Sequence, residues 1–127
     1  MLGLFTSKAP LVRDIIVPES ATAPDAERYA LITAVVDYVN HMMEHGAYRR
    51  WELPAAAMQA YHCDYYYAQV TNGGHSQFIH NSRMQQGVLH DAEAGLKAMG
   101  AKVQLDCLRQ MRAWAEANAE AAAAQDG

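Results

Sequence analysis

The sequence of 127 residues contains little cysteine, no long apolar run and no excess of basic residues. Its two cysteines, Cys63 and Cys107, are too few for the disulfide framework of small secreted domains. Its apolar stretches fall far short of the roughly 20 residues that cross a membrane. The first residues lack the basic start and the long apolar segment of a secretory signal. We therefore expect a cytoplasmic protein that does not enter a membrane.

The shortage of basic residues bears on nucleic-acid binding. Ten Lys and Arg residues stand against 14 Asp and Glu residues, which gives a formal net charge of -4. Direct binding of nucleic acid requires clustered Lys and Arg side chains that neutralise phosphates. Arg49 and Arg50 beside Trp51 hint at such a cluster, but we interpret them as a solvated loop. Direct nucleic-acid binding is therefore not expected, and the mild acidity does not by itself mark a surface that resembles DNA.

What the sequence has in abundance is helical periodicity. Its length and its 51% hydrophobic residues suffice for a core that needs no cross-links. Apolar residues recur at spacings of three and four, and no convincing pair of strands is present. We predict an all-α fold, a single compact domain of about five helices over residues 22–127. Residues 1–21 should form an extended N-terminal arm that lies on this domain.

The helix boundaries follow from proline and capping residues at the starts and from glycine at the ends. The predicted helices span residues 24–45, 54–71, 75–82, 88–99 and 102 onward. The periodicity predicts that the residues facing the core include Leu31, Val35, Val39, Met43, Leu89, Leu96, Met99, Val103, Leu105, Leu108, Met111 and Trp114. From Ala115 onward large side chains are absent. Because alanine buries little surface, we expect this end to fray or project.

Residues 65–82 carry the most specific information in the chain. They follow a run with four tyrosines between residues 61 and 67, which we interpret as core packing, with an aromatic-lined pocket or interface as the alternative. Asn72, Gly73 and Gly74 then predict a structural turn. Glycine adopts the left-handed conformation that ends a helix, and asparagine tolerates it next best. The turn should fold one helix back on the next.

A short helix should follow this turn, with Gln77 and Asn81, four residues apart, on one face. Folding could bring these amides close to Asn72, to a histidine and to a tyrosine hydroxyl, which together would form a small polar pocket. We therefore predict that Asn72, Gln77, His80 and Asn81 bind a ligand or a protein partner. The alternative is that the amides cap helix ends and hold the turn.

Two short patterns suggest catalysis but have a structural explanation. His41, Glu44 and His45 form an H-x-x-E-H pattern, in which two histidines on one helix face could share a zinc ion. The pattern lies in the last helical turn before a glycine, where histidine also interacts favourably with the helix dipole. Cys63 lies between His62 and Asp64, and we interpret it as a buried core residue. We therefore predict no metal and no cofactor, and we favour a protein that is not an enzyme.

The central stretch resembles the DNA-mimic-protein-like family, catalogued as domain of unknown function 4375. The family pattern is Asn-Gly-Gly, a Gln with following aromatics and an Asn-Ser pair, and a later helix that ends in Met-Gly-Ala. The matching residues here are Asn72, Gly73, Gly74, Gln77, Phe78, Asn81, Ser82, Met99, Gly100 and Ala101. The resemblance covers roughly residues 25 to 112 and departs from the pattern at His75 and near Ile79, where the family often has aromatics.

This resemblance implies an all-helical fold and a non-enzymatic protein-interaction domain. Members of the family imitate DNA with an acidic dimer surface and so block a transcription factor. The expected partner is accordingly a DNA-binding regulator, and a homodimer is an open possibility. An acidic face that includes Asp37, Glu44, Asp91 and Glu93 could meet the basic surface of such a partner. The alternative remains a small-ligand or enzymatic site at the Asn-Gly-Gly turn.

Overall fold

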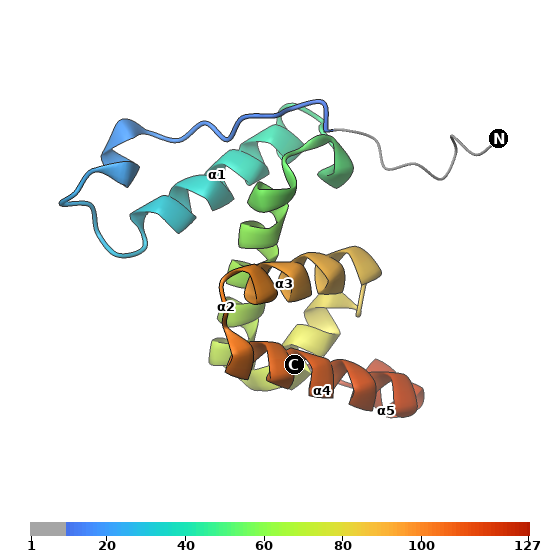
Figure 1. The fold of residues 1–127 in the computed structure, drawn as a ribbon. Helices are drawn as coiled ribbons and strands as arrows, with labels where there is room; N and C mark the ends of the chain where they lie inside the picture. The colour runs from blue at the N-terminus through green and yellow to red at the C-terminus, as the bar shows by residue number, and fades with distance from the viewer. Residues whose placement is uncertain (1–9) are drawn as a thin grey trace. The chain divides into compact units, whose positions relative to one another are not determined.

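The computed structural model describes residues 10–127, and these residues form an all-α fold without strands, as predicted (Figure 1). The five α-helices are α1 (Ala30–Glu44), α2 (Ala55–Ser82), α3 (Gln86–Ala98), α4 (Lys102–Ala117) and α5 (Ala119–Ala123). Two short 3-10 helices, η2 (Glu19–Thr22) and η3 (Arg50–Glu52), lie in the N-terminal part. None of the helices in residues 10–127 is both long and apolar enough to cross a membrane.

The chain divides into two compact units, Met1–Met58 and Gln59–Gly127. The division falls within α2, so the first turn of this helix belongs to the N-terminal unit. The predicted boundary at residue 21, between an N-terminal arm and a helical domain, stays a prediction. Residues 1–9 of the predicted arm lie outside the part of the chain that the structure describes.

In the N-terminal unit, residues 10–18 form neither helix nor strand, and they are held within their own unit. The backbone N–H of Val12 donates to the carbonyl of Glu52 at 2.9 Å. The hydroxyl of Tyr38, on α1, donates to the carbonyl of Asp14 at 2.8 Å. These contacts hold this segment against η3 and α1.

The first long helix begins later than its sequence pattern predicts. It starts at Ala30 rather than at Pro24, and residues 23–29 form turns instead. The predicted cap fails because the Thr22 hydroxyl donates back to the carbonyl of Glu19 at 3.0 Å, which stabilises η2. A threonine that bonds backward does not satisfy the N–H groups of a helix that follows it.

The core of the C-terminal unit joins α2, α3, α4 and α5. Its buried residues are Cys63, Tyr66, Phe78, Ile79, Leu89, Ala92, Leu96, Leu105, Leu108, Met111, Ala115 and Ala122. Helices α2 and α3 approach closely at Gly95, where an added Cβ would lie 2.5 Å from the Cys63 sulfur. A side chain at this position would therefore push the two helices apart.

Several residues that the periodicity placed in the core are exposed instead. They are Leu31, Met43, Met99, Val103 and Trp114, with 37% to 71% of their surface accessible. In α4 the buried face runs through Leu105, Leu108, Met111 and Ala115, and Val103 and Trp114 lie off this stripe. The helix carries apolar residues on more than one face, so spacing alone could not select the buried one.

The alanine-rich end packs against the unit and does not project, which corrects the prediction that it frays. Helix α4 ends at Ala117, the backbone of the following Asn118 leaves helical geometry (φ -131°, ψ 55°), and α5 begins at Ala119. Ala115 and Ala122 are buried. Ala122, on α5, belongs to the same buried core as Phe78 and Ile79, which follow the turn in α2, although its small side chain buries little area.

Candidate functional site

The Asn-Gly-Gly segment bends α2, as the sequence predicts, although the helix continues on both sides of the bend (Figure 1). Gly73 (φ -140°, ψ 16°) and Gly74 (φ 74°, ψ -173°) have non-helical dihedral angles. The angles of Gly74 are accessible almost only to glycine. Gly73 is needed for a different reason, because an added Cβ would collide with the side chain of Gln77.

Four side-chain amides bond to one another across this bend. We call them the amide cluster: Gln69, Asn72, Gln77 and Asn81. The amide of Asn72 donates to Oε1 of Gln77 at 2.9 Å, and the amide of Gln77 donates to Oε1 of Gln69 at 2.9 Å. Asn81 donates to the same Gln69 oxygen at 2.7 Å. The structure thus brings together three of the four predicted site residues.

The fourth member of the amide cluster, Gln69, was not predicted from the sequence. It precedes Asn72 by three residues, which places both on one face of the helix before the bend. This spacing could have identified Gln69 as a neighbour of Asn72. It could not show that the bend brings Gln77 and Asn81 within hydrogen-bond distance of Gln69.

A tyrosine and a histidine make a second link across the bend. The hydroxyl of Tyr66 lies 2.7 Å from Nε2 of His75. Burial raises the pKa of Tyr66 to about 12, so the hydroxyl keeps its proton and donates it to the imidazole. Burial also lowers the pKa of His75, which favours the neutral ring that can accept this bond. The expected proximity of a histidine and a tyrosine hydroxyl at the turn is therefore present.

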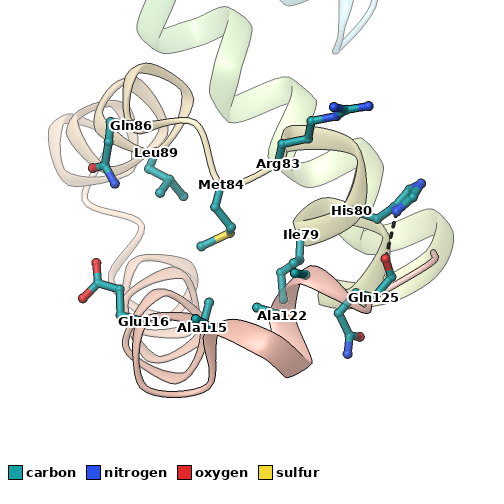
Figure 2. Close-up of a pocket in the computed structure, with 12 residues that line it drawn as sticks. Ile79, His80, Arg83, Met84, Gln86, Leu89, Ala115, Glu116, Ala122 and Gln125 are labelled. Carbon is teal, nitrogen blue, oxygen red and sulfur yellow. Dashed lines mark hydrogen bonds between the residues drawn. The ribbon is translucent and has the colours of Figure 1, made fainter.

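His80 does not join the amide cluster. Its Nδ1 lies 2.8 Å from the backbone carbonyl of Gln125, and this contact holds the end of the chain against α2 (Figure 2). The ring itself is exposed. His80 therefore lies at the border between the amide cluster and a cavity on the neighbouring side of the helix.

This cavity has a volume of about 500 Å³ and lies within the C-terminal unit (Figure 2). Its walls come from the end of α2, the start of α3, the end of α4, and α5. The residues that line it are Ile79, His80, Arg83, Met84, Gln86, Leu89, Ala115, Glu116, Ala119, Ala122, Ala123 and Gln125. Figure 2 shows Ile79 and Met84 directed into the hollow. The sequence had pointed to the turn itself and not to this hollow.

One wall of the cavity is fixed by Arg112. Its guanidinium donates to Oε1 of Gln86 at 2.9 Å, to Glu116 at 3.2 Å and to Glu93 at 3.2 Å. Glu93 also accepts a bond from Arg109 at 2.8 Å, and this bond lowers the pKa of the Glu93 carboxyl. These bonds tie α3 to α4 beside the cavity.

The predicted acidic face does not extend into the C-terminal unit. Asp91 is buried, and its carboxylate lies 2.8 Å from Nδ1 of the equally buried His62. Glu93 is neutralised by Arg109 and Arg112. Asp91 faces α2 and Glu93 faces α4, because α3 packs against both helices. The positions of acidic residues in the sequence do not show which helices α3 packs against.

The candidate nucleophile and the candidate zinc motif have unfavourable settings. Burial raises the pKa of the Cys63 thiol to about 11, so the nucleophilic thiolate is scarce at neutral pH. His41 and His45 are exposed, with ring centroids 5.1 Å apart, at the end of α1. Among residues 10–127 no group of three His, Cys, Asp or Glu side chains, Glu44 included, is placed to hold a metal ion.

Comparison with known proteins identifies a family. No curated protein and no solved structure matches the chain. The model of the family described as DMP19-like protein matches residues 52–126, more than half of the chain and nearly the whole C-terminal unit. The further name, domain of unknown function 4375, stays a prediction. The match includes the bent helix, the amide cluster and the cavity, and the chain therefore belongs to the DMP19-like protein family.

Proposed function

We propose that this chain is a non-enzymatic protein-interaction domain that binds a DNA-binding regulator in place of DNA. The observation that carries the proposal is membership of the DMP19-like protein family, because the family model covers the motif residues that carry the resemblance to DNA-mimic proteins. A cytoplasmic location and a homodimer belong to the same proposal. The buried setting of Cys63 and of His62 supports the non-enzymatic role, because neither is presented to a substrate.

We place the partner contact on the exposed side of the amide cluster. Asn72 and Asn81 are exposed, and each uses its amide nitrogen to bond within the cluster. Neither carbonyl oxygen has a partner among the described residues. These two oxygens can therefore accept hydrogen bonds from the arginine and lysine side chains that a DNA-binding protein directs at phosphates.

Charge supports the same kind of partner. The unit Gln59–Gly127 contains seven Asp and Glu residues and five Lys and Arg residues. Asp106, Glu120 and Asp126 are exposed and make no ion pair with another residue of the described chain. Such acids attract a basic partner over distances of about one Debye length, roughly 8 Å at physiological salt.

Affinity capture tests the proposal. The full chain, immobilised, is exposed to a cell lysate, and the bound proteins are eluted with short duplex DNA at constant salt. The proposal predicts that a protein with DNA-binding activity is released by DNA and that capture weakens as the salt concentration rises. Capture of proteins that duplex DNA does not release would contradict it, and so would binding of the DNA by the immobilised chain itself.

A further inference from the structure

We propose that the cavity between Ile79, Met84 and α5 binds a small amphipathic anion, a molecule with an apolar body and a single carboxylate. This site goes beyond the protein partner proposed above and does not depend on it. The sequence suggested a small-ligand site at the Asn-Gly-Gly turn as an alternative to a protein partner. There the amides bond to one another, and the hollow lies on the neighbouring side of the helix, with His80 between the two.

The cavity exists because one of its walls is made of alanine. Ala115, Ala119, Ala122 and Ala123 line it from the end of α4 and from α5. Across from these methyl groups lie larger apolar side chains, among them Ile79 and Leu89, and these do not fill the space (Figure 2). The resulting volume of about 500 Å³ lies within the roughly 300–1,000 Å³ of small-molecule sites.

Hydrogen bonds hold the cavity open from two sides. Arg112 ties Gln86 at the start of α3 to Glu116 at the end of α4. On the other side His80 bonds to the carbonyl of Gln125, which keeps α5 in place against α2. A space with both walls bonded in this way is a preformed site, and a ligand that enters it does not have to order the walls first.

The side chain of Met84 makes the entrance adaptable. Arg83 and Met84 both have left-handed backbone dihedral angles, with φ of 53° and 54°. The Ser82 hydroxyl accepts the N–H of Met84 at 3.2 Å and so supports this turn. The turn directs the Met84 side chain over the hollow (Figure 2), and an unbranched thioether can move to fit apolar ligands of different shape.

The charge at the cavity selects the class of ligand. Glu116 is the acid among the lining residues, and it is bound by Arg112. Arg83 is exposed at the outer edge, where Figure 2 shows its guanidinium directed away from the hollow, and it makes no ion pair with any described residue, so a rotation of this long side chain would bring it to a carboxylate at the entrance. A guanidinium binds a carboxylate well, and the apolar interior favours a hydrocarbon chain or ring behind that carboxylate.

Titration of the full chain with octanoate, and separately with the uncharged 1-octanol, tests the proposal by nuclear magnetic resonance. We expect saturable one-to-one binding of octanoate, with shifts at the methyl groups of the lining alanines. Arg83→Gln should weaken octanoate by about threefold to fivefold, the effect of an exposed ion pair, and leave 1-octanol unchanged. The control Lys97→Gln removes an exposed charge that does not line the cavity.

Filling the cavity tests its location. Ala119→Leu should abolish binding of both compounds, whereas Ala121→Leu, on the same helix but outside the cavity, should not. If Ala119→Leu disturbs folding by circular dichroism, Ala123→Leu serves in its place. The proposal is overturned if octanoate does not saturate the wild-type chain, if the leucine variants inside the cavity still bind it, or if Arg83→Gln weakens both compounds equally.

Discussion

At the scale of single residues, His62 and Asp91 form a buried polar contact between α2 and α3 in the C-terminal unit. The two side chains lie 2.8 Å apart with 11% and 8% of their surface accessible. Removing one partner of a buried hydrogen bond leaves the other group unsatisfied, which costs about 1–3 kcal/mol and more where a charged group is involved. Asp91→Asn keeps the shape and loses the charge, so we expect it to lower the free energy of unfolding by about 2–4 kcal/mol.

Urea denaturation measures this loss. We expect a lower midpoint of unfolding and an unchanged slope of the unfolding free energy against urea concentration. The control is Asp106→Asn, which makes the same chemical change on the exposed surface of α4 and should stay within about 0.5 kcal/mol. Equal effects of the two substitutions would show that the contact between α2 and α3 does not depend on the pair.

His75 gives the stability a pH dependence. Burial lowers the pKa of His75 below its ordinary value of 6.5, so the folded state binds its proton less readily than the unfolded state. The contribution of the neutral ring is therefore present above about pH 6.5 and is lost as the pH falls below that value. We expect His75→Asn to show a smaller loss of stability between pH 7.5 and pH 5.5 than the wild-type chain.

Thermal unfolding across this pH range compares the two proteins. His90→Asn, an exposed histidine on α3, is the matched control and should leave the pH dependence of the wild type in place. A His75→Asn variant whose stability falls as steeply as that of the wild type would rule out this role for the link between Tyr66 and His75.

The residues of the candidate site were predicted unevenly, for a physical reason. The shared face of Gln77 and Asn81 follows from helical spacing, and both indeed bond to Gln69. The buried state of Asp91 does not follow from spacing, because it depends on which helix packs against α3. Contacts within one helix can be predicted from the sequence, whereas contacts between helices require the fold.

At the scale of the elements, the bend in α2 depends on Gly74. Its dihedral angles, φ 74° and ψ -173°, lie in a region almost restricted to glycine, and residues forced into such regions cost about 1–3 kcal/mol. No atom would obstruct an added methyl group, so the cost comes from the backbone alone. We expect Gly74→Ala to lower the free energy of unfolding by about 2 kcal/mol.

Chemical denaturation of Gly74→Ala, with Ser76→Ala as its neighbour control, measures this cost. Ser76→Ala adds no backbone constraint and should change the stability by about 0.5 kcal/mol or less. If Gly74→Ala is as stable as the wild type, then the helix can bend at this place without a glycine.

The elements themselves show where sequence patterns are sufficient. The end of α1 next to Gly46 and the bend after Asn72 follow from local residues, and both are present. The packing of the alanine-rich end could not be predicted in this way, because a helix of small residues is stabilised here by a surface on α2 that is distant in sequence. The late start of α1 has a local cause, because the Thr22 hydroxyl bonds to the carbonyl of Glu19 within η2 and does not cap a helix that follows.

At the scale of the whole molecule, the family match and the compact units coincide. The match begins at residue 52 and the C-terminal unit begins at Gln59, so the N-terminal unit lies almost entirely outside the family model. The N-terminal unit also has more of the exposed large apolar residues than the C-terminal unit, among them Leu11, Ile16, Tyr29 and Trp51. The proposed DNA-like role therefore rests on the C-terminal unit.

Competition with DNA for a purified regulator is the measurement that tests this role most directly. The regulator is a DNA-binding protein obtained by the capture experiment, and its labelled duplex is followed by fluorescence anisotropy. We predict that the full chain releases the duplex in a saturable manner, and that Asn72→Ala with Asn81→Ala weakens release by about tenfold, the loss of two hydrogen bonds of roughly 0.5–1.5 kcal/mol each. The control combines Gln104→Ala with Gln110→Ala, two exposed positions of α4, and should release the duplex as the wild-type chain does. A ternary complex of regulator, DNA and chain would contradict the central claim.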